Sequence, residues 1–90
     1  MVALSFPLHP PGSAKSRLAE LAGAGVPTLV VQGDRDPFGR PEEFPVDRDT
    51  SYVVAAVRGD HGLRTGRARP TPADLEPVVV IVAEWLLALP

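Results

Sequence analysis

The chain has 90 residues, which is enough for one small domain but short for a parallel sheet covered on both faces. Its formal net charge of −2 gives no general attraction to nucleic acid or to anionic membranes, and without cysteine it has neither disulfides nor thiolate metal sites. The longest stretch poor in charge, Val78–Leu89, is too short to cross a bilayer, and no signal peptide is recognisable. We therefore expect a cytoplasmic protein.

The first part of the chain predicts a short strand, a rigid loop and a helix. Val2–Phe6 is an apolar run that ends at Pro7, because proline supplies no donor to a sheet. After a proline-rich loop, Ser13 is a suitable N-cap for a helix with Leu18 and Leu21 on one face. The glycines that follow are expected to end this helix.

The segment Val26–Gly39 contains the clearest strand and the first candidate site residues. Its first part is an apolar, β-branched run without alternation, which predicts a strand buried on both faces and hence a parallel sheet between helices. The run ends at Gly33, and the carboxylates of Asp34 and Asp36 follow. Ligands of such sheets bind at the carboxyl ends of the strands, so these two residues lie where a site is expected.

A second buried strand and a C-terminal helix follow. Ser51–Val57 is an apolar run that also ends in a glycine and ionisable residues. Thr71 then offers an N-cap for a helix that we expect to continue through Leu89. The run Val78–Val82 is β-branched and would also fit a strand, and Pro77 removes one helical hydrogen bond. The helical spacing of the apolar residues, which share one broad face, favours the helix: Leu75, Val78, Val79, Val82, Trp85, Leu86 and Leu89.

The order of elements indicates the fold class. Between the two clear strands, Pro41–Phe44 fits one helical turn. The order is then strand, helix, strand, short turn, strand and helix, which is typical of parallel crossover units of right-handed sense. We therefore predict an α/β fold with about three parallel strands and flanking helices.

Asp36 and His61 form the constellation that could carry chemistry. Each follows one of the two clear strands, so both side chains should emerge at the same edge of a parallel sheet. There the carboxylate would accept a hydrogen bond from one ring nitrogen of His61, fix its tautomer and stabilise the imidazolium. These are two of the three groups of a hydrolytic triad.

The same residues carry a resemblance to a known family. The order strand, Gly-x-x-Asp, strand, Asp-His and terminal helix resembles the last third of an α/β-hydrolase. More narrowly, Phe6–Gly12 and Val26–Gly39 resemble the dienelactone-hydrolase-like branch related to the KANL3/Tex30 proteins. This resemblance implies that Asp36 rather than Asp34 is the acid and that His61 is the general base. It also implies a small ester or acyl substrate and no organic cofactor.

The nucleophile of that family is missing from the sequence. The motif Gly-x-Ser-x-Gly does not occur, and every serine lacks its flanking glycines: Ser5, Ser13, Ser16 and Ser51. We therefore expect residues 1–90 to be a single partial domain, the C-terminal part of an α/β-hydrolase fold without the half that carries the nucleophile. The chain alone is then expected to be inactive as an esterase.

Simpler roles remain open for the candidate residues. On strand spacing alone, His61 could be an ordinary loop histidine, and Asp34 fits a turn in which it bonds its own backbone. His9 could line a substrate pocket or only stabilise its loop. These residues and Asp36 lack the spacing of a metal motif, so we expect no metal site. Four arginines form either an anion-binding patch or a solvated loop: Arg58, Arg64, Arg67 and Arg69.

A non-catalytic role is the competing hypothesis. Three strands leave the first strand, Val2–Phe6, with an unpaired edge, and the terminal helix has little chain against which to bury its apolar face. Such a module would pair through the sheet edge with another chain or with itself. It would be indifferent to the loss of Asp36 or His61.

Overall fold

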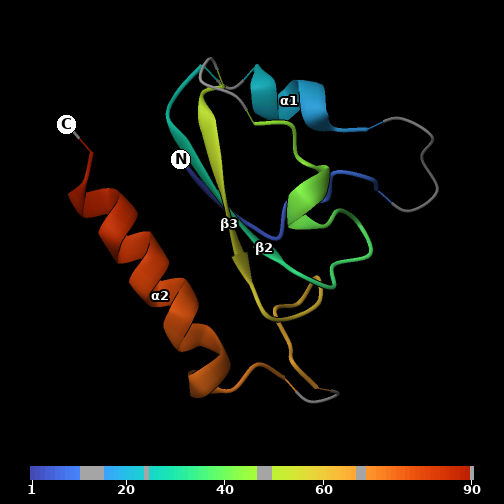
Figure 1. Ribbon diagram of the computed structural model, residues 1–90, viewed down its shortest axis with the longest axis vertical. Helices are drawn as coiled ribbons and strands as arrows, with labels where there is room; N and C mark the ends of the chain where they lie inside the picture. The colour runs from blue at the N-terminus through green and yellow to red at the C-terminus, as the bar shows by residue number, and fades with distance from the viewer. Residues whose placement is uncertain (11–15, 24, 47–49, 67–68, 90) are drawn as a thin grey trace.

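A parallel sheet of three strands lies at the centre of the molecule. The computed structural model describes residues 1–10, 16–23, 25–46, 50–66 and 69–89. The strands β1 (Val2–Leu4), β2 (Thr28–Gly33) and β3 (Tyr52–Val57) run parallel in the order β1-β2-β3 (Figure 1). The α/β fold with three parallel strands is therefore confirmed.

The middle strand, β2, is buried along its whole length, as its lack of alternation predicts. In the ladder between β2 and β3, Thr28 pairs with Tyr52 and Gly33 pairs with Val57. The two strands therefore end at the same level, and the loops that follow them start side by side.

Short elements cover the first face of the sheet. They are α1 (Leu18–Ala22) and η1 (Pro41–Glu43), a single 3₁₀ turn. The buried side chains of this face form one cluster: Leu8, Leu21, Val30, Phe44 and Tyr52. The expected turn at Pro41–Phe44 is thus present.

The long helix α2 (Pro72–Leu87) covers the second face (Figure 1). Val78 is its buried residue, and it packs in a cluster with residues of both neighbouring strands and of the following loop: Leu29, Val31, Val57 and Leu63. Ile81, Val82 and Trp85 pack against this cluster and are half-buried. Helices on both faces explain why no side of β2 is exposed.

The beginning of α2 is fixed by its own sequence. The Thr71 Oγ1 atom accepts a hydrogen bond from the backbone N–H of Asp74, and the carboxylate of Asp74 accepts one from the N–H of Thr71. The helix continues through Pro77, so the alternative of a strand at Val78–Val82 is wrong. It ends at Leu87 instead of continuing through Leu89.

Helix α1 differs from its prediction at the beginning. It starts at Leu18, whose N–H donates to the Ser16 Oγ atom, and the expected cap Ser13 lies outside the described residues.

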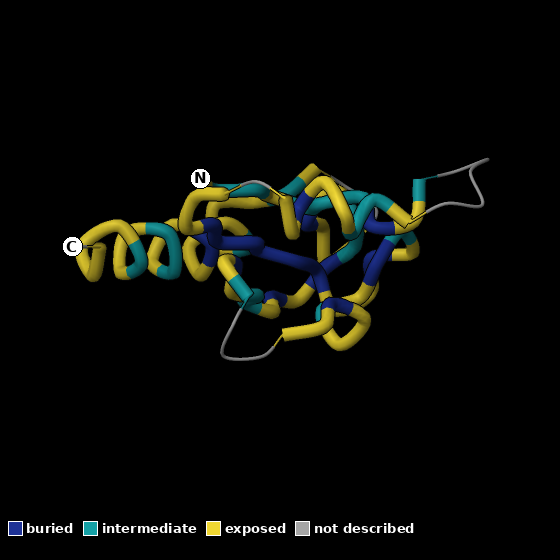
Figure 2. Tube along the Cα trace, turned by 90° about the horizontal axis from the view of Figure 1, so that it is seen from above, coloured by how far each residue is buried: buried dark blue, intermediate teal, exposed yellow. Residues whose placement is uncertain are grey.

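Burial is concentrated in β2 and in the loops at the carboxyl edge of the sheet, whereas β3, which was expected to be a second buried strand, is buried only at its two ends. Figure 2 shows this buried centre and, projecting beyond it, the mostly exposed helix α2. Of the apolar residues expected on the inner face of α2, four are exposed in the structure: Leu75, Val79, Leu86 and Leu89. A sheet of three strands is too narrow to cover so wide an apolar surface. None of the described helices has the length and apolar character that crossing a membrane requires.

Candidate functional site

Two glycines bring the loops at the carboxyl ends of β2 and β3 into contact. A Cβ atom on Gly33 would lie 2.4 Å from the carbonyl oxygen of Gly59, so only glycine fits at the end of β2. Gly59 itself has a φ of 142°, a conformation that side chains rarely adopt. The pattern of a buried strand followed by a glycine therefore reflects a direct approach of the two backbones.

Hydrogen bonds then join the two loops. The backbone N–H of Asp34 donates to the Val57 carbonyl at 2.8 Å, and the N–H of Arg35 donates to the Gly59 carbonyl at 2.9 Å. The Asp34 Oδ1 atom accepts from the N–H of Gly59 at 3.0 Å. Asp34 lies in a turn, as expected, but its side chain bonds Gly59 instead of its own backbone and so connects the two loops.

Asp36 is fully buried at this junction, with 0% of its surface exposed. Its Oδ1 atom accepts from the backbone N–H of Phe38 at 2.8 Å, which fixes one side of the carboxylate. Its Oδ2 atom lies 2.8 Å from the Nδ1 atom of His61 and 3.1 Å from the Nε2 atom of Gln32. The structure thus brings together the two residues that the sequence analysis selected, Asp36 and His61. Their roles as acid and base stay predictions.

His61 lies between Asp36 and solvent. The ring of Phe38 meets its ring edge to face, with 4.7 Å between the ring centres. Its side chain is 36% exposed, while the Asp36 side chain is 0% exposed. If the carboxylate is ionised and the ring neutral, the carboxylate can only accept, so the ring would carry its proton on Nδ1 and leave Nε2 as an acceptor.

The turn that carries His61 is stabilised by Asp60. The Asp60 Oδ1 atom accepts from the backbone N–H groups of Gly62 and Arg64, at 2.9 Å and 3.0 Å. The hydrogen bond from the Arg64 backbone N–H lowers the pKa of Asp60, and the Arg64 guanidinium lowers it further. Leu63 has a positive φ of 61° and is buried, so its side chain anchors this turn in the core. Asp60 and Leu63 together thus order the turn that follows β3.

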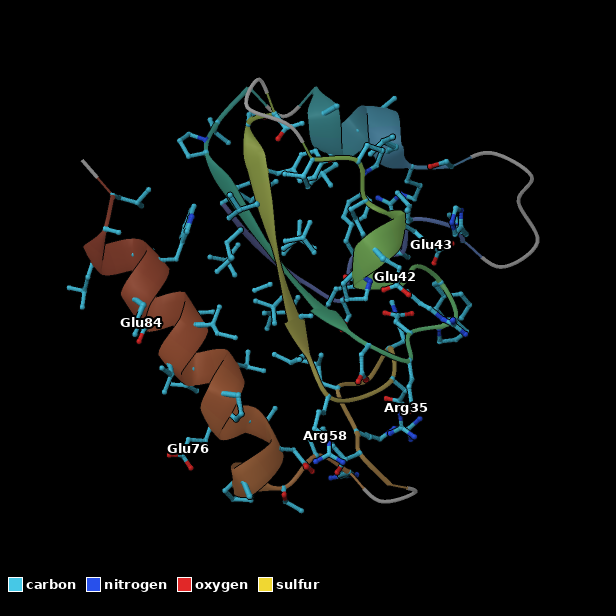
Figure 3. The ribbon with its side chains drawn as sticks, viewed as in Figure 1. Arg35, Glu42, Glu43, Arg58, Glu76 and Glu84 are labelled. Carbon is cyan, nitrogen blue, oxygen red and sulfur yellow. The ribbon has the colours of Figure 1, made fainter. Side chains whose placement is uncertain are left out.

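An open hollow of about 560 Å³ lies beside Asp36. It is lined by Asp36, Pro37, Arg40, Glu42 and Glu43, and Figure 3 shows the last two on η1. The backbone N–H of Arg40 donates to Glu43 at 2.6 Å and holds the pKa of that carboxyl below its ordinary value. The hollow therefore has a strongly charged wall.

His9 pairs with Glu43 near this hollow. Its Nε2 atom lies 3.1 Å from the Glu43 Oε1 atom, and its backbone N–H donates to the Phe38 carbonyl at 2.7 Å. The second bond connects the loop after β1 to the loop that holds Asp36. His9 thus stabilises its loop, one of the two alternatives that the sequence left open. Within the described residues, no three histidine or acidic side chains are grouped so as to hold a metal ion.

The described arginines after β3 are all exposed: Arg58, Arg64 and Arg69. Arg58 and Arg35 both lie beyond the strand ends in Figure 3. Arg64 pairs with Asp60 at 3.1 Å, and Arg69 is exposed. Arg67 lies outside the described residues. The solvated loop is therefore the better description of this segment.

Sequence reasoning missed Gln32, which donates to Asp36 from the middle of the core. Its signal was a polar residue inside an apolar run, one position before the glycine that ends β2. A buried amide needs hydrogen-bond partners, so this position should have been expected to join a polar network.

The fold and the site together define a class of protein. A parallel sheet lies between helices, and the ends of two neighbouring strands carry a buried aspartate bonded to a half-exposed histidine. The chain matches the family model of the alpha/beta hydrolase domain over residues 1–81. The protein belongs to that family. No curated protein and no solved structure matches the chain.

Proposed function

We propose that this chain supplies the acid, Asp36, and the general base, His61, of a triad that hydrolyses small esters or related acyl compounds. The hydrogen bond of 2.8 Å between a fully buried carboxylate and a histidine that reaches solvent is the observation that carries the proposal. Membership of the α/β-hydrolase family supports it. We place the chain in the dienelactone-hydrolase-like branch, which is related to the KANL3/Tex30 proteins, because the segment Val26–Gly39 resembles that branch.

In this proposal each of the two residues has its own task. Asp36 would accept the Nδ1–H of His61 across their 2.8 Å contact, which leaves the Nε2 atom as an acceptor. In acyl transfer, Nε2 would take the proton of the attacking hydroxyl and then deliver it to the leaving group. The buried carboxylate would stabilise the imidazolium that exists between these two steps.

The attacking hydroxyl and the oxyanion donors come, in this proposal, from residues outside these 90. Gly-x-Ser-x-Gly is absent from the sequence, so no serine here sits in the strand-to-helix turn that exposes a nucleophile. A parallel strand beside β1 would end at the same edge as the loops of Asp36 and His61. Such a strand could carry the nucleophile to the site.

An esterase assay tests this proposal. The purified chain should hydrolyse p-nitrophenyl acetate no faster than the variant His61→Ala, and a fluorophosphonate probe for activated serine should not label it. A burst of p-nitrophenol that His61→Ala abolishes would show that the chain holds its own nucleophile. The proposal of a missing nucleophile would then be wrong.

A second candidate function is a module that pairs through the outer edge of β1. The C=O of Met1 and the N–H of Ser5 bond to β2, and backbone groups alternate along a strand. The main-chain groups of Val2 and Leu4 therefore face the outer edge. Met1 and Leu4 are also among the exposed apolar side chains. This role would need neither Asp36 nor His61, and light scattering tests it as described in the Discussion.

A further inference from the structure

Gln32 is a buried polar side chain that has no task in the proposed acyl transfer. It is the fifth residue of β2, and 0% of its surface is exposed. Its neighbours in the strand, Val30 and Val31, are apolar core residues. An amide at this depth is costly unless its donors and acceptor are all engaged.

The Gln32 amide is engaged on every side. Its Oε1 atom accepts from the backbone N–H of Phe6 at 2.9 Å. Its Nε2 atom lies 2.9 Å from the Phe6 carbonyl, 2.7 Å from the Gly39 carbonyl and 3.1 Å from the Asp36 Oδ2 atom. The Gln32 side chain therefore joins three parts of the structure: the segment after β1, the Asp36 carboxylate and the end of the loop that carries Asp36.

The two bonds to Phe6 give the amide a fixed plane. The side-chain amide accepts from the N–H of Phe6 and donates to its C=O, as the backbone of a neighbouring strand would. The Oε1 and Nε2 atoms cannot exchange places without breaking both bonds. The Nε2 group consequently faces Asp36 and Gly39.

Asp36 is in turn fixed from two directions. Phe38 donates to the Oδ1 atom, and Gln32 and His61 share the Oδ2 atom. Rotation of the carboxylate would break the contacts of both oxygens. With Gln32 in place, the Oδ2 atom stays directed at the His61 Nδ1 atom.

We propose that Gln32 is a positioning residue that acts through Asp36, holding its carboxylate in the orientation that selects the Nδ1–H tautomer of His61. This inference rests on the proposed function, because it matters for catalysis only if His61 is the base. A purely structural glutamine would stabilise the fold and leave the His61 tautomer unchanged. The two roles therefore differ in a spectroscopic quantity.

The variant Gln32→Met tests the proposal, because methionine is similar in length and offers no N–H. Long-range ¹H–¹⁵N spectra of the folded chain report which ring nitrogen of each histidine carries the proton. The variant His9→Gln identifies the signals of His61. We expect Gln32→Met to shift His61 from mainly Nδ1–H toward a mixture, in the same direction as Asp36→Asn does.

Thr28→Val is the matched control. Thr28 is also buried and lies on β2, and its hydroxyl donates to the Val26 carbonyl at the other end of the strand. This control should keep the wild-type tautomer even if its stability falls. A folded Gln32→Met with the wild-type tautomer would overturn the inference. If Asp36→Asn itself leaves the tautomer unchanged, the proposed function fails, whatever Gln32 does.

A second measurement is independent of whether Gln32→Met folds. In the otherwise wild-type chain, Asp36→Asn should shift the side-chain amide signals of Gln32, because it replaces the acceptor of Nε2. Glu84→Gln on α2 should leave them in place, since Glu84 is an exposed residue of that helix (Figure 3). Gln32 amide signals that do not respond to Asp36→Asn would contradict the contact on which the inference depends.

Discussion

At the scale of single residues, the site depends on the absence of a side chain at Gly33 as much as on the groups that are present. The approach of the two loops leaves no space for a Cβ atom there, and the loop bonds of Asp34 and Arg35 form across the same contact. The positions of Asp36 and His61 are therefore set by backbone contact before their side chains meet.

Gly33→Ala should destabilise the protein by roughly 1–3 kcal/mol, because the added methyl group would push the loops apart. Urea unfolding measures this free energy. The matched control is Gly66→Ala, where no atom lies within 4 Å of the added Cβ. We expect the control to change stability by less than about 0.5 kcal/mol. Equal effects of the two substitutions would contradict the close approach at Gly33.

The sequence could predict that Asp36 and His61 meet, because each residue directly follows a strand that is recognisable from its own segment. A carboxylate and an imidazole that directly follow two neighbouring parallel strands must meet at one edge. Gln32 escaped prediction because its partners include Phe6, which lies 26 residues away in the chain. Nothing in the pattern around Gln32 specifies that pairing.

At the scale of elements, α2 packs on the sheet through one buried residue, Val78, and through three half-buried residues of its later turns. Val78 is 6% exposed and the next residue, Val79, is 64% exposed. Both are valines in the same turn of the same helix, so they form a natural pair for comparison. The sequence predicted the helix from the spacing of its apolar residues. These residues extend around so much of the helix that the sequence alone did not show which of them face the sheet.

Val78→Ala should therefore lower the free energy of unfolding by about 1.5–3 kcal/mol, the value of burying such a side chain. Val79→Ala should change it by less than about 0.5 kcal/mol. Chemical denaturation of both variants under the same conditions makes the comparison. A larger loss for Val79→Ala would mean that the opposite side of α2 packs on the sheet.

The cap of α2 predicts a dependence on pH. The backbone N–H of Thr71 and the hydroxyl of Thr65 donate to Asp74 and hold its pKa below the ordinary value. A carboxyl whose pKa is lowered by folding stabilises the protein above its unfolded pKa of about 3.9, and this contribution is lost as pH falls through the folded value.

The stability difference between wild type and Asp74→Asn should therefore shrink as the pH falls from 7 to below about 4. Urea unfolding at several pH values measures it. Glu76→Gln is the control on the same helix, since Glu76 projects away from the sheet (Figure 3). A difference for Asp74→Asn that does not change with pH would contradict the capping role of the Asp74 carboxylate.

At the scale of the whole molecule, the protein is a thin slab. Its Cα atoms extend 37 × 36 × 17 Å, and apolar side chains are exposed on β1, on β3 and on α2. The sequence predicted the layers correctly because the buried strand β2 requires cover on both faces. It also predicted that α2 would have too little chain to pack against, and the exposed apolar residues of α2 agree with this.

The outer edge of β1 predicts how self-association would respond to substitution. If copies of the chain pair through this edge, Leu4→Pro should abolish the oligomer, because it removes an outward N–H and leaves the bonds of Met1 and Ser5 to β2. Leu4→Thr keeps the N–H and should keep the oligomer. Light scattering after size exclusion measures the mass. A wild-type monomer would count against the second candidate function.

The most direct test of the central claim is the protonation pattern of the His61 ring. Its ¹⁵N shifts should show the Nδ1–H tautomer in the neutral ring of wild type, and Asp36→Asn should remove that preference. A wild-type His61 that carries its proton mainly on Nε2, or that does not respond to Asp36→Asn, would contradict the proposal that this chain holds the acid and the base of a hydrolase.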